Sequence, residues 1–116
     1  MTVLIVEDNA GVRRLLRSVV AGIADAAWDC SDGSRALEAY ADHQPDIVLM
    51  DIQMPGMDGL AATREILRVH PLAKIVIVTD YDDDELRIAA REAGACGYAL
   101  KLNLLDLVAL IHSVAG

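Results

Sequence analysis

Residues 47–59 read IVLMDIQMPGMDG and place an acidic residue directly after an apolar run. A short, continuously apolar run is typical of a strand that is buried on both faces of a parallel sheet. Asp51 ends this run, and the Pro55-Gly56 pair that follows predicts a turn. A carboxylate at the end of a core strand raises the question of which residues end the other strands.

The rest of the chain repeats this pattern of short strands and amphipathic helices. Apolar runs predict strands at residues 3–7, 26–30, 46–51, 74–79 and 97–100. The segments between and after them predict helices at residues 12–23, 33–42, 58–69, 83–93 and 103–114. The predicted N-caps are Asp8 or Asn9, Asp32, Asp58, Asp82 and Asn103, and Gly94 is the predicted C-cap of the fourth helix.

Five strands that alternate with five helices predict an α/β fold. Strands that are apolar almost throughout indicate a parallel sheet covered by helices on both faces. Right-handed crossovers leave few topologies, and we expect a doubly wound sheet in the strand order 2-1-3-4-5. In that layout the ligand site lies beyond the carboxyl ends of the first and third strands, where the winding reverses.

The overall charge excludes some classes of function. The formal net charge of −8 argues against direct nucleic-acid binding, which needs clustered Lys and Arg. No apolar run approaches the roughly 18–20 residues of a membrane span, and the N-terminal sequence lacks the features of a signal peptide. We therefore expect no contact with a membrane and a cytoplasmic location.

Polar residues stand at the ends of four predicted strands. They are Glu7, Asp8, Asp51, Thr79 and Lys101. Because the carboxyl ends of parallel strands share one edge of the sheet, these side chains should converge. Carboxylates held together repel one another unless a cation joins them, and hard oxygen ligands suit Mg²⁺. The edge of the sheet is therefore a predicted magnesium site.

The same group of residues suits phosphoryl transfer. A metal ion and Lys101 on either side of Asp51 would neutralise the charge on a phosphoryl group that its carboxylate attacks. Thr79 could donate a hydrogen bond from its hydroxyl to the resulting acyl phosphate. The predicted chemistry is phosphorylation of Asp51.

Four motifs occur together in the order and spacing of a known family. VLIVEDN (3–9), IVLMDIQMPGMDG (47–59), IVIVTDY (75–81) and GYALK (97–101) resemble the response-regulator receiver domains of two-component signalling. The resemblance covers essentially the whole chain and implies a flavodoxin-like fold, with residues 1–116 as one receiver domain. The segment 82–107 most resembles receivers that precede a helix-turn-helix output domain, which implies a possible link to transcription.

The resemblance implies a role for each residue at the metal site. Asp51 would be the phosphoacceptor. Asp8 and Asp51 would bind Mg²⁺ directly, and Glu7 would contact it through water. The backbone carbonyl of Gln53 would be a further ligand.

The resemblance also implies how the signal is passed on. Thr79 and Lys101 would sense the phosphoryl group, and Tyr98 would be the aromatic switch residue. A sensor histidine kinase or a phosphotransfer protein would supply the phosphoryl group. The chain would catalyse only its own phosphorylation and dephosphorylation, and would not be an enzyme acting on an external substrate.

Two positions differ from the usual family pattern. Leu102 follows Lys101 where receivers usually have proline, often after a cis peptide bond, so a bend that aims the lysine could be lost. A non-proline cis bond costs about 2.5–4 kcal/mol, so a trans bond is expected here. Asp80 replaces a small residue after Thr79, and it could slow phosphorylation or restrain Tyr98 through a hydrogen bond.

The last predicted helix, within NLLDLVALIHSVAG (103–116), is apolar over an unusually wide arc. Packing on one sheet needs a stripe of roughly 100°, and the apolar residues of this helix spread over about twice that angle. Large exposed apolar patches mark interfaces. We therefore expect a homodimer, or a docked output domain, on the face formed by the fourth helix, the fifth strand and the fifth helix.

Two alternative functions remain open from the sequence. A phosphatase or phosphotransferase with an aspartyl-phosphate intermediate would carry a DxD motif, whereas Ile52 and Gln53 follow Asp51 here. A degenerate receiver that acts as a phosphorylation-independent interaction module would keep the fold and lose the switch. The complete set of strand-end residues argues against that alternative, while Leu102 and Asp80 favour it.

Overall fold

A computed structural model describes residues 1–54 and 56–115, so the turn predicted at Pro55 lies outside the described residues. The strands are β1 (Thr2–Val6), β2 (Ala26–Cys30), β3 (Ile47–Met50), β4 (Ile75–Thr79) and β5 (Gly97–Leu100). The helices are α1 (Ala10–Ala21), α2 (Ala36–His43), α3 (Gly59–Val69), α4 (Asp84–Ala93) and α5 (Leu104–Ala115). A short 3-10 helix, η1 (Gly33–Arg35), precedes α2.

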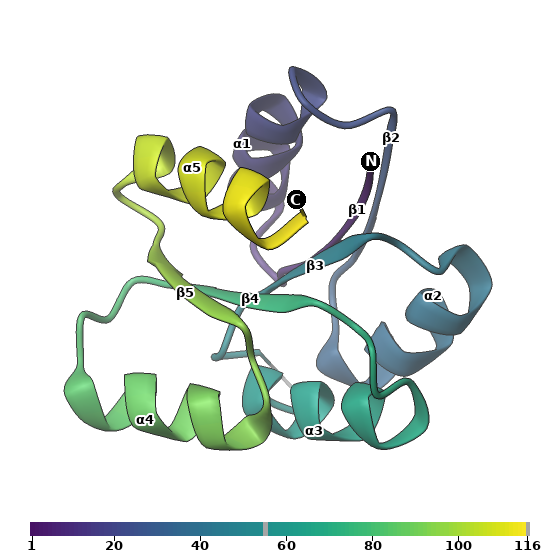
Figure 1. Cartoon of the computed structure of the whole chain (residues 1–116), viewed down its shortest axis with the longest axis vertical. Helices are drawn as coiled ribbons and strands as arrows, with labels where there is room; N and C mark the ends of the chain where they lie inside the picture. The colour runs from purple at the N-terminus through teal and green to yellow at the C-terminus, as the bar shows by residue number, and fades with distance from the viewer. Residues whose placement is uncertain (55, 116) are drawn as a thin grey trace.

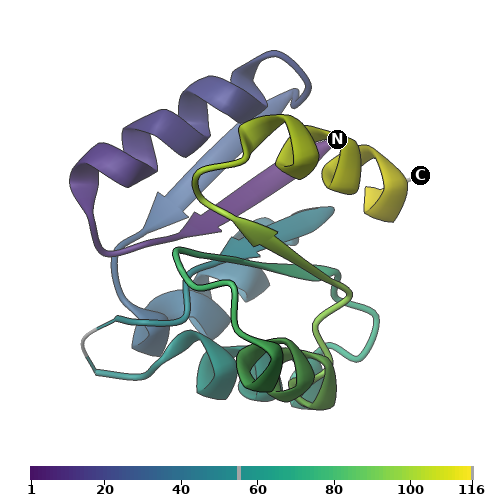
Figure 2. The same cartoon turned by 90° about the vertical axis from the view of Figure 1, so that its left-hand side faces the viewer.

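The strands form one parallel sheet in the predicted order β2-β1-β3-β4-β5. Helices α1 and α5 cover one face of this sheet, and α2, α3 and α4 cover the other (Figures 1 and 2). The predicted doubly wound fold is therefore confirmed. The winding reverses between β1 and β3, and the carboxyl ends of these two strands lie side by side.

The core lies on both faces of the sheet because side chains alternate along each strand. Ile47 and Leu49 of β3 pack in the cluster beneath α1 and α5, whereas Val48 and Met50 pack in the cluster above α2, α3 and α4. All four side chains are at most 1% exposed. Burying an aliphatic side chain of this size contributes about 1.5–3 kcal/mol, so β3 is anchored firmly immediately before Asp51.

The strand register brings the strand ends together. Val6 of β1 pairs with Met50 of β3, and the N–H of Asp51 donates to the carbonyl oxygen of Val6 at 2.9 Å. Between β4 and β5, the N–H of Lys101 donates to the carbonyl oxygen of Thr79 at 2.9 Å. The backbone ladder thus continues one residue past the strands and holds Asp51 and Lys101 in place.

Most of the predicted helix caps are confirmed. Asn9 caps α1, Asp32 caps η1, and Asp58 caps α3, each through its side chain. Asn103 accepts from the N–H of Asp106 at the start of α5.

The predicted cap of α4 is wrong by one residue. Its N-cap is Asp83, whose side chain accepts from the N–H of Leu86, and Asp82 instead forms an ion pair with Arg87 at 3.0 Å. Gly94 ends this helix as predicted, because its φ of +103° is a left-handed conformation that glycine adopts without strain.

Helix α5 buries more of its apolar arc than the sequence suggested. Leu107 and Ile111 are fully buried, and Leu104, Leu110 and Val114 pack partly buried against the same cluster. Leu105 remains 85% exposed. Among the described residues, no helix is long and apolar enough to cross a bilayer.

Candidate functional site

Asp51 lies directly beyond β3 and is only 6% exposed. Close packing behind it depends on Gly59, the first residue of α3. A Cβ atom at Gly59 would lie 1.8 Å from the carbonyl oxygen of Asp51, and the Gly59 N–H donates to the carbonyl oxygen of Ile52 at 2.8 Å. The Asp58-Gly59 pair in the sequence therefore has two roles: a helix cap, and a glycine that lets α3 approach the strand end.

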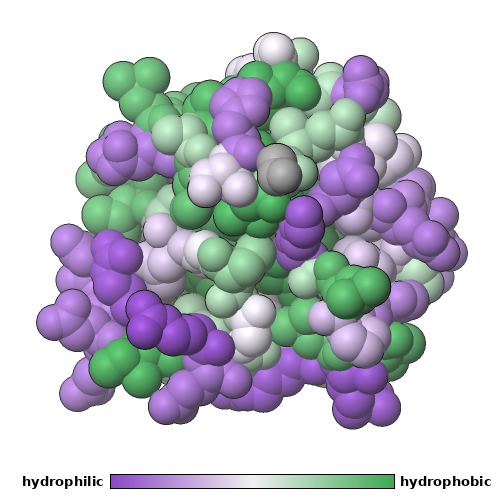
Figure 3. Space-filling view, in the orientation of Figure 1, coloured by the Kyte–Doolittle hydropathy of each residue, from purple (hydrophilic) through white to green (hydrophobic). Residues whose placement is uncertain are grey.

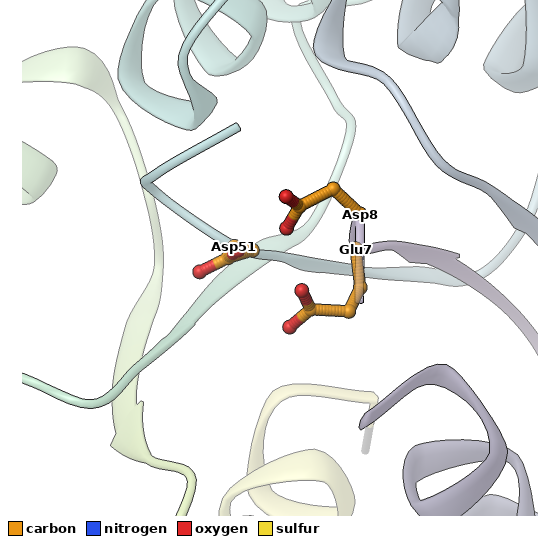
Figure 4. A group of neighbouring side chains, drawn as sticks. All are labelled: Glu7, Asp8 and Asp51. Carbon is orange, nitrogen blue, oxygen red and sulfur yellow. The ribbon is translucent and has the colours of Figure 1, made fainter. Parts of the chain in front are cut away.

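Three carboxylates meet at the ends of β1 and β3. Figure 4 shows Glu7 and Asp8 projecting from the end of β1 toward Asp51. One oxygen of each carboxylate lies within 4.8 Å of the others. Glu7 is 1% exposed, whereas Asp8 is exposed to solvent. The structure therefore brings together the three acidic side chains that the sequence predicted to converge.

Lys101 reaches this acidic cluster from the end of β5. Its Nζ atom lies 2.7 Å from Oε1 of Glu7 and 3.2 Å from Oδ1 of Asp51. Leu102 does not misdirect the lysine, and no cis peptide bond occurs among the described residues, as predicted. Burial alone lowers the pKa of Lys101, but the hydrogen bond to Glu7 and the charge of Asp51 outweigh it, so the net pKa is raised.

The electrostatics of the cluster favour an additional cation. Burial, followed by the charge of Glu7, raises the pKa of Asp51 to about 7, although Lys101 opposes this rise. Three carboxylates carry more negative charge than one ammonium group can neutralise. A small hard cation that prefers oxygen ligands fits this set of donors, and Mg²⁺ is the commonest such ion at phosphate sites.

Thr79 completes the set of strand-end residues. It is buried at the end of β4, and its Oγ1 atom accepts a hydrogen bond from the N–H of Tyr81 at 3.3 Å. The site opens into a cavity of about 220 Å³. The cavity wall contains Glu7, Asp8, Asn9, Val12, Asp51, Gln53, Thr79, Asp80, Tyr81 and Lys101.

A side-chain hydrogen bond joins two residues of the cavity wall. The hydroxyl of Tyr81 donates to Oε1 of Gln53 at 3.2 Å, which links the loop after β4 to the loop after β3. The side chain of Gln53 is thus used in this contact. Its predicted role as a metal ligand concerns the backbone carbonyl and stays a prediction.

Tyr98 is held by the loop that follows β4. Its hydroxyl donates to the carbonyl oxygen of Tyr81 at 2.5 Å, and the guanidinium of Arg87 lies 4.4 Å from its ring centroid. Of the two effects considered for Asp80, the hydrogen bond to Tyr98 is not formed, because the Tyr98 hydroxyl donates to the carbonyl oxygen of Tyr81 instead. Burial raises the pKa of Tyr98, and the nearby Arg87 charge partly opposes this.

The turn between β1 and α1 contains contacts that sequence patterns did not reveal. The N–H of Asn9 donates to Oε2 of Glu7 at 3.1 Å. Arg13, in the first turn of α1, donates from Nη1 to the carbonyl oxygens of Glu7 and Asp8, both at 2.9 Å. A spacing of five or six residues between an arginine and its partners does not by itself predict a contact. The contacts depend on how α1 turns back over the end of β1.

Comparison with known proteins identifies the relatives of this chain. Residues 3–112 match the response regulator receiver domain family. The DNA-binding transcriptional regulator NtrC of Escherichia coli K12 is 36% identical over 111 residues, covering 95% of this chain and 24% of NtrC. The response regulator GacA of Pseudomonas aeruginosa PAO1 is 39% identical over 121 residues, covering 97% of this chain and 54% of GacA. The chain thus spans about a quarter of NtrC and about half of GacA.

The fold has close counterparts among solved structures. A crystal structure of a LuxR-family two-component response regulator from Aurantimonas sp. SI85-9A1 superposes with a TM-score of 0.93 at 32% sequence identity. The superposition covers 98% of this chain and 84% of that one. The two folds therefore agree over nearly the whole of this chain.

Proposed function

The chain belongs to the response regulator receiver domain family, and we propose that it is a phosphorylation switch whose phosphoacceptor is Asp51. Residues 1–116 would act as one receiver domain, in the cytoplasm. Receivers are generally signalling modules, and the proposed chemistry is limited to phosphorylation and dephosphorylation of this chain. The observation that carries the proposal is the position of the buried Asp51 carboxylate, 3.2 Å from Lys101 Nζ and within 4.8 Å of two further carboxylates.

The proposed donor is a phosphohistidine on a sensor kinase or a phosphotransfer protein. A carboxylate oxygen of Asp51 would form a bond to phosphorus while the bond from phosphorus to the histidine nitrogen breaks. The electron pair of that bond leaves with the imidazole. Lys101, already in contact with Asp51, would move its ammonium charge toward the transferred phosphoryl oxygens, which is where negative charge must be stabilised.

Four residues of the chain would hold Mg²⁺. They are Glu7, Asp8, Asp51 and, through its backbone carbonyl, Gln53. The bound ion would supply positive charge that lowers the repulsion between the carboxylates and the incoming phosphoryl group. The raised pKa of Asp51, caused first by burial and then by the charge of Glu7, supports this proposal, because a bound cation would offset both effects.

Signal transmission would run through Tyr81. Its N–H donates to Oγ1 of Thr79, and its carbonyl oxygen accepts from the hydroxyl of Tyr98. If the Thr79 hydroxyl turns to donate to a phosphoryl oxygen, the Tyr81 backbone would be drawn toward the site. The contact that holds Tyr98 would then change, and with it the contact between Tyr98 and Arg87 on α4.

The proposed output surface is formed by α4, β5 and α5. Ile88 of α4 is 56% exposed, Leu102 is 93% exposed, and Leu105 is 85% exposed. In Figure 3, hydrophobic residues gather at the upper left, where Figure 1 places the junction between β5 and α5. We propose that this surface binds a second copy or an output domain. Sedimentation that shows a strict monomer at high concentration, with and without a phosphoryl analogue, would exclude the homodimer.

A phosphorylation-independent interaction module is the second candidate. The exposed Asp80 beside the site is the observation that favours it, since a further carboxylate opposes an incoming phosphoryl group. The two candidates differ in their response to beryllofluoride, a mimic of the phosphoryl group. A switch binds it only with Mg²⁺ and an intact Asp51, whereas a degenerate module does not respond.

The test compares three proteins by NMR titration with beryllofluoride and Mg²⁺. The unmodified chain and Asp42→Asn, an exposed carboxylate on α2, are expected to respond. Asp51→Asn is expected to show no response. A lack of response in all three proteins would refute the proposed switch.

A further inference from the structure

Arg13 is tied to the backbone that carries the acidic residues. A single nitrogen, Nη1, donates to the carbonyl oxygens of Glu7 and Asp8, both at 2.9 Å. Hydrogen bonds from a charged donor are stronger than neutral ones. Arg13 therefore restrains two consecutive peptide units at the point where β1 turns into α1.

We infer that Arg13 is a positioning residue that orients Glu7 and Asp8 to bind a divalent cation. The inference rests on the proposed metal site described above. Arg13 does not touch that site directly: it acts through the two backbone carbonyls. Its role concerns how tightly the cation binds.

The backbone matters here because packing does not hold Asp8. Its side chain is exposed, so the orientation of its peptide units largely decides where the carboxylate points. Glu7 is better restrained, since it is 1% exposed and its Oε2 atom also accepts from the N–H of Asn9 at 3.1 Å. Loss of Arg13 should thus affect Asp8 more than Glu7.

Charge and positioning predict opposite effects of removing Arg13. A positive charge near the acidic cluster repels a divalent cation, so electrostatics alone predict that Arg13→Gln binds Mg²⁺ more tightly. Loss of the two backbone contacts predicts weaker binding. Removing groups that orient metal ligands typically weakens metal affinity by about 10–100-fold. For this partly exposed turn we expect about tenfold.

Arg14 supplies a matched control within the same turn of helix. It carries the same charge and is exposed. Among the described residues, its side chain forms neither an ion pair nor a hydrogen bond with the β1–α1 turn. Arg14→Gln therefore removes an equal charge and leaves the proposed positioning contacts intact.

The experiment measures Mg²⁺ affinity by isothermal titration calorimetry for the unmodified chain, Arg13→Gln and Arg14→Gln. We expect about tenfold weaker binding for Arg13→Gln and equal or slightly tighter binding for Arg14→Gln. In the metal-free protein, the carbonyl ¹³C resonances of Glu7 and Asp8 should shift in Arg13→Gln alone. This second readout does not depend on the metal.

The outcomes separate the inference from the proposed function. If the unmodified chain binds no Mg²⁺, the metal site itself is refuted, and the inference with it. If the unmodified chain binds Mg²⁺ and Arg13→Gln binds equally or more tightly, only the inference is overturned. Should Arg13→Gln fail to fold, Arg13→Lys keeps the charge without the planar guanidinium. It is then expected to bind more weakly than the unmodified chain, and equal binding would overturn the inference.

Discussion

Replacing Asp51 with Asn should stabilise the metal-free protein, and the gain should depend on pH. The pKa of Asp51 rises from 3.8 to about 7 in the folded state because the group is buried beside Glu7. The folded state therefore binds this proton more tightly than the unfolded chain does. The effect on stability is absent below about pH 4, grows as the pH rises from about 4 to 7, and is then constant.

The magnitude follows from the size of the shift. A rise of roughly three pH units corresponds to about 4 kcal/mol at 1.36 kcal/mol per unit. The cavity beside Asp51 opens to solvent, so screening should reduce the cost to about 2 kcal/mol. Asn at position 51 resembles the neutral carboxyl group and escapes this cost. Asp51→Asn should therefore exceed the unmodified chain by about 2 kcal/mol at pH 8 and match it near pH 4.

Urea unfolding of the metal-free proteins at several pH values measures this difference. Acidic groups far from Asp51 are unaffected by the substitution, so their contributions cancel when the two stabilities are subtracted. Asp42→Asn, which changes an exposed carboxylate on α2, should show a much smaller difference with little dependence on pH. A constant stability difference for Asp51→Asn across the pH range, or a loss of stability at pH 8, would contradict the electrostatic account of the site.

Three further substitutions test separate parts of the structure. Gly59→Ala should lower the free energy of unfolding in urea by about 3 kcal/mol, because the added Cβ would collide with the backbone of Asp51. Gly22→Ala should leave this free energy nearly unchanged, because a Cβ at Gly22 meets no atom within 4 Å. Equal effects of the two would refute the close packing behind the site. Lys101→Met should bind Mg²⁺ roughly tenfold more tightly by calorimetry, since a competing cation is removed; weaker binding would contradict this. Asp83→Ala should lower the free energy of unfolding by about 1 kcal/mol, because the N-cap of α4 is lost, and Asp82→Ala should lower it by less than about 0.5 kcal/mol. A larger loss for Asp82→Ala would instead support Asp82 as the cap, as predicted from the sequence.

The fold and the composition of the site could be predicted because both follow from local pattern and parallel topology. The apolar run before Asp51 identified a central strand, and parallel strands necessarily bring their carboxyl ends to one edge. Glu7, Asp8 and Lys101 were therefore expected beside it, and the structure places them there. The cap of α4 was misassigned because several neighbouring acids can each cap a helix, and only the backbone conformation of Asp83 distinguishes it.

The contacts that connect the site to the rest of the molecule could not be predicted. Tyr98 donates to a backbone carbonyl, which any residue at position 81 would present, so no sequence pattern indicated Tyr81 as its partner. The two bonds from Arg13 likewise end on backbone oxygens. Contacts of this kind do not depend on the residue type of the backbone partner, so they can be identified only once the path of the chain is known.

The most direct test of the central claim is to locate the phosphoryl group. The chain is incubated with acetyl phosphate and Mg²⁺, reduced with borohydride to mark the acyl phosphate, and mapped by mass spectrometry. We predict one modified residue, Asp51, with no labelling when Mg²⁺ is removed or when Asp51 is replaced by Asn. Undiminished labelling of the Asp51→Asn variant, or modification of another acidic residue in the unmodified chain, would contradict it.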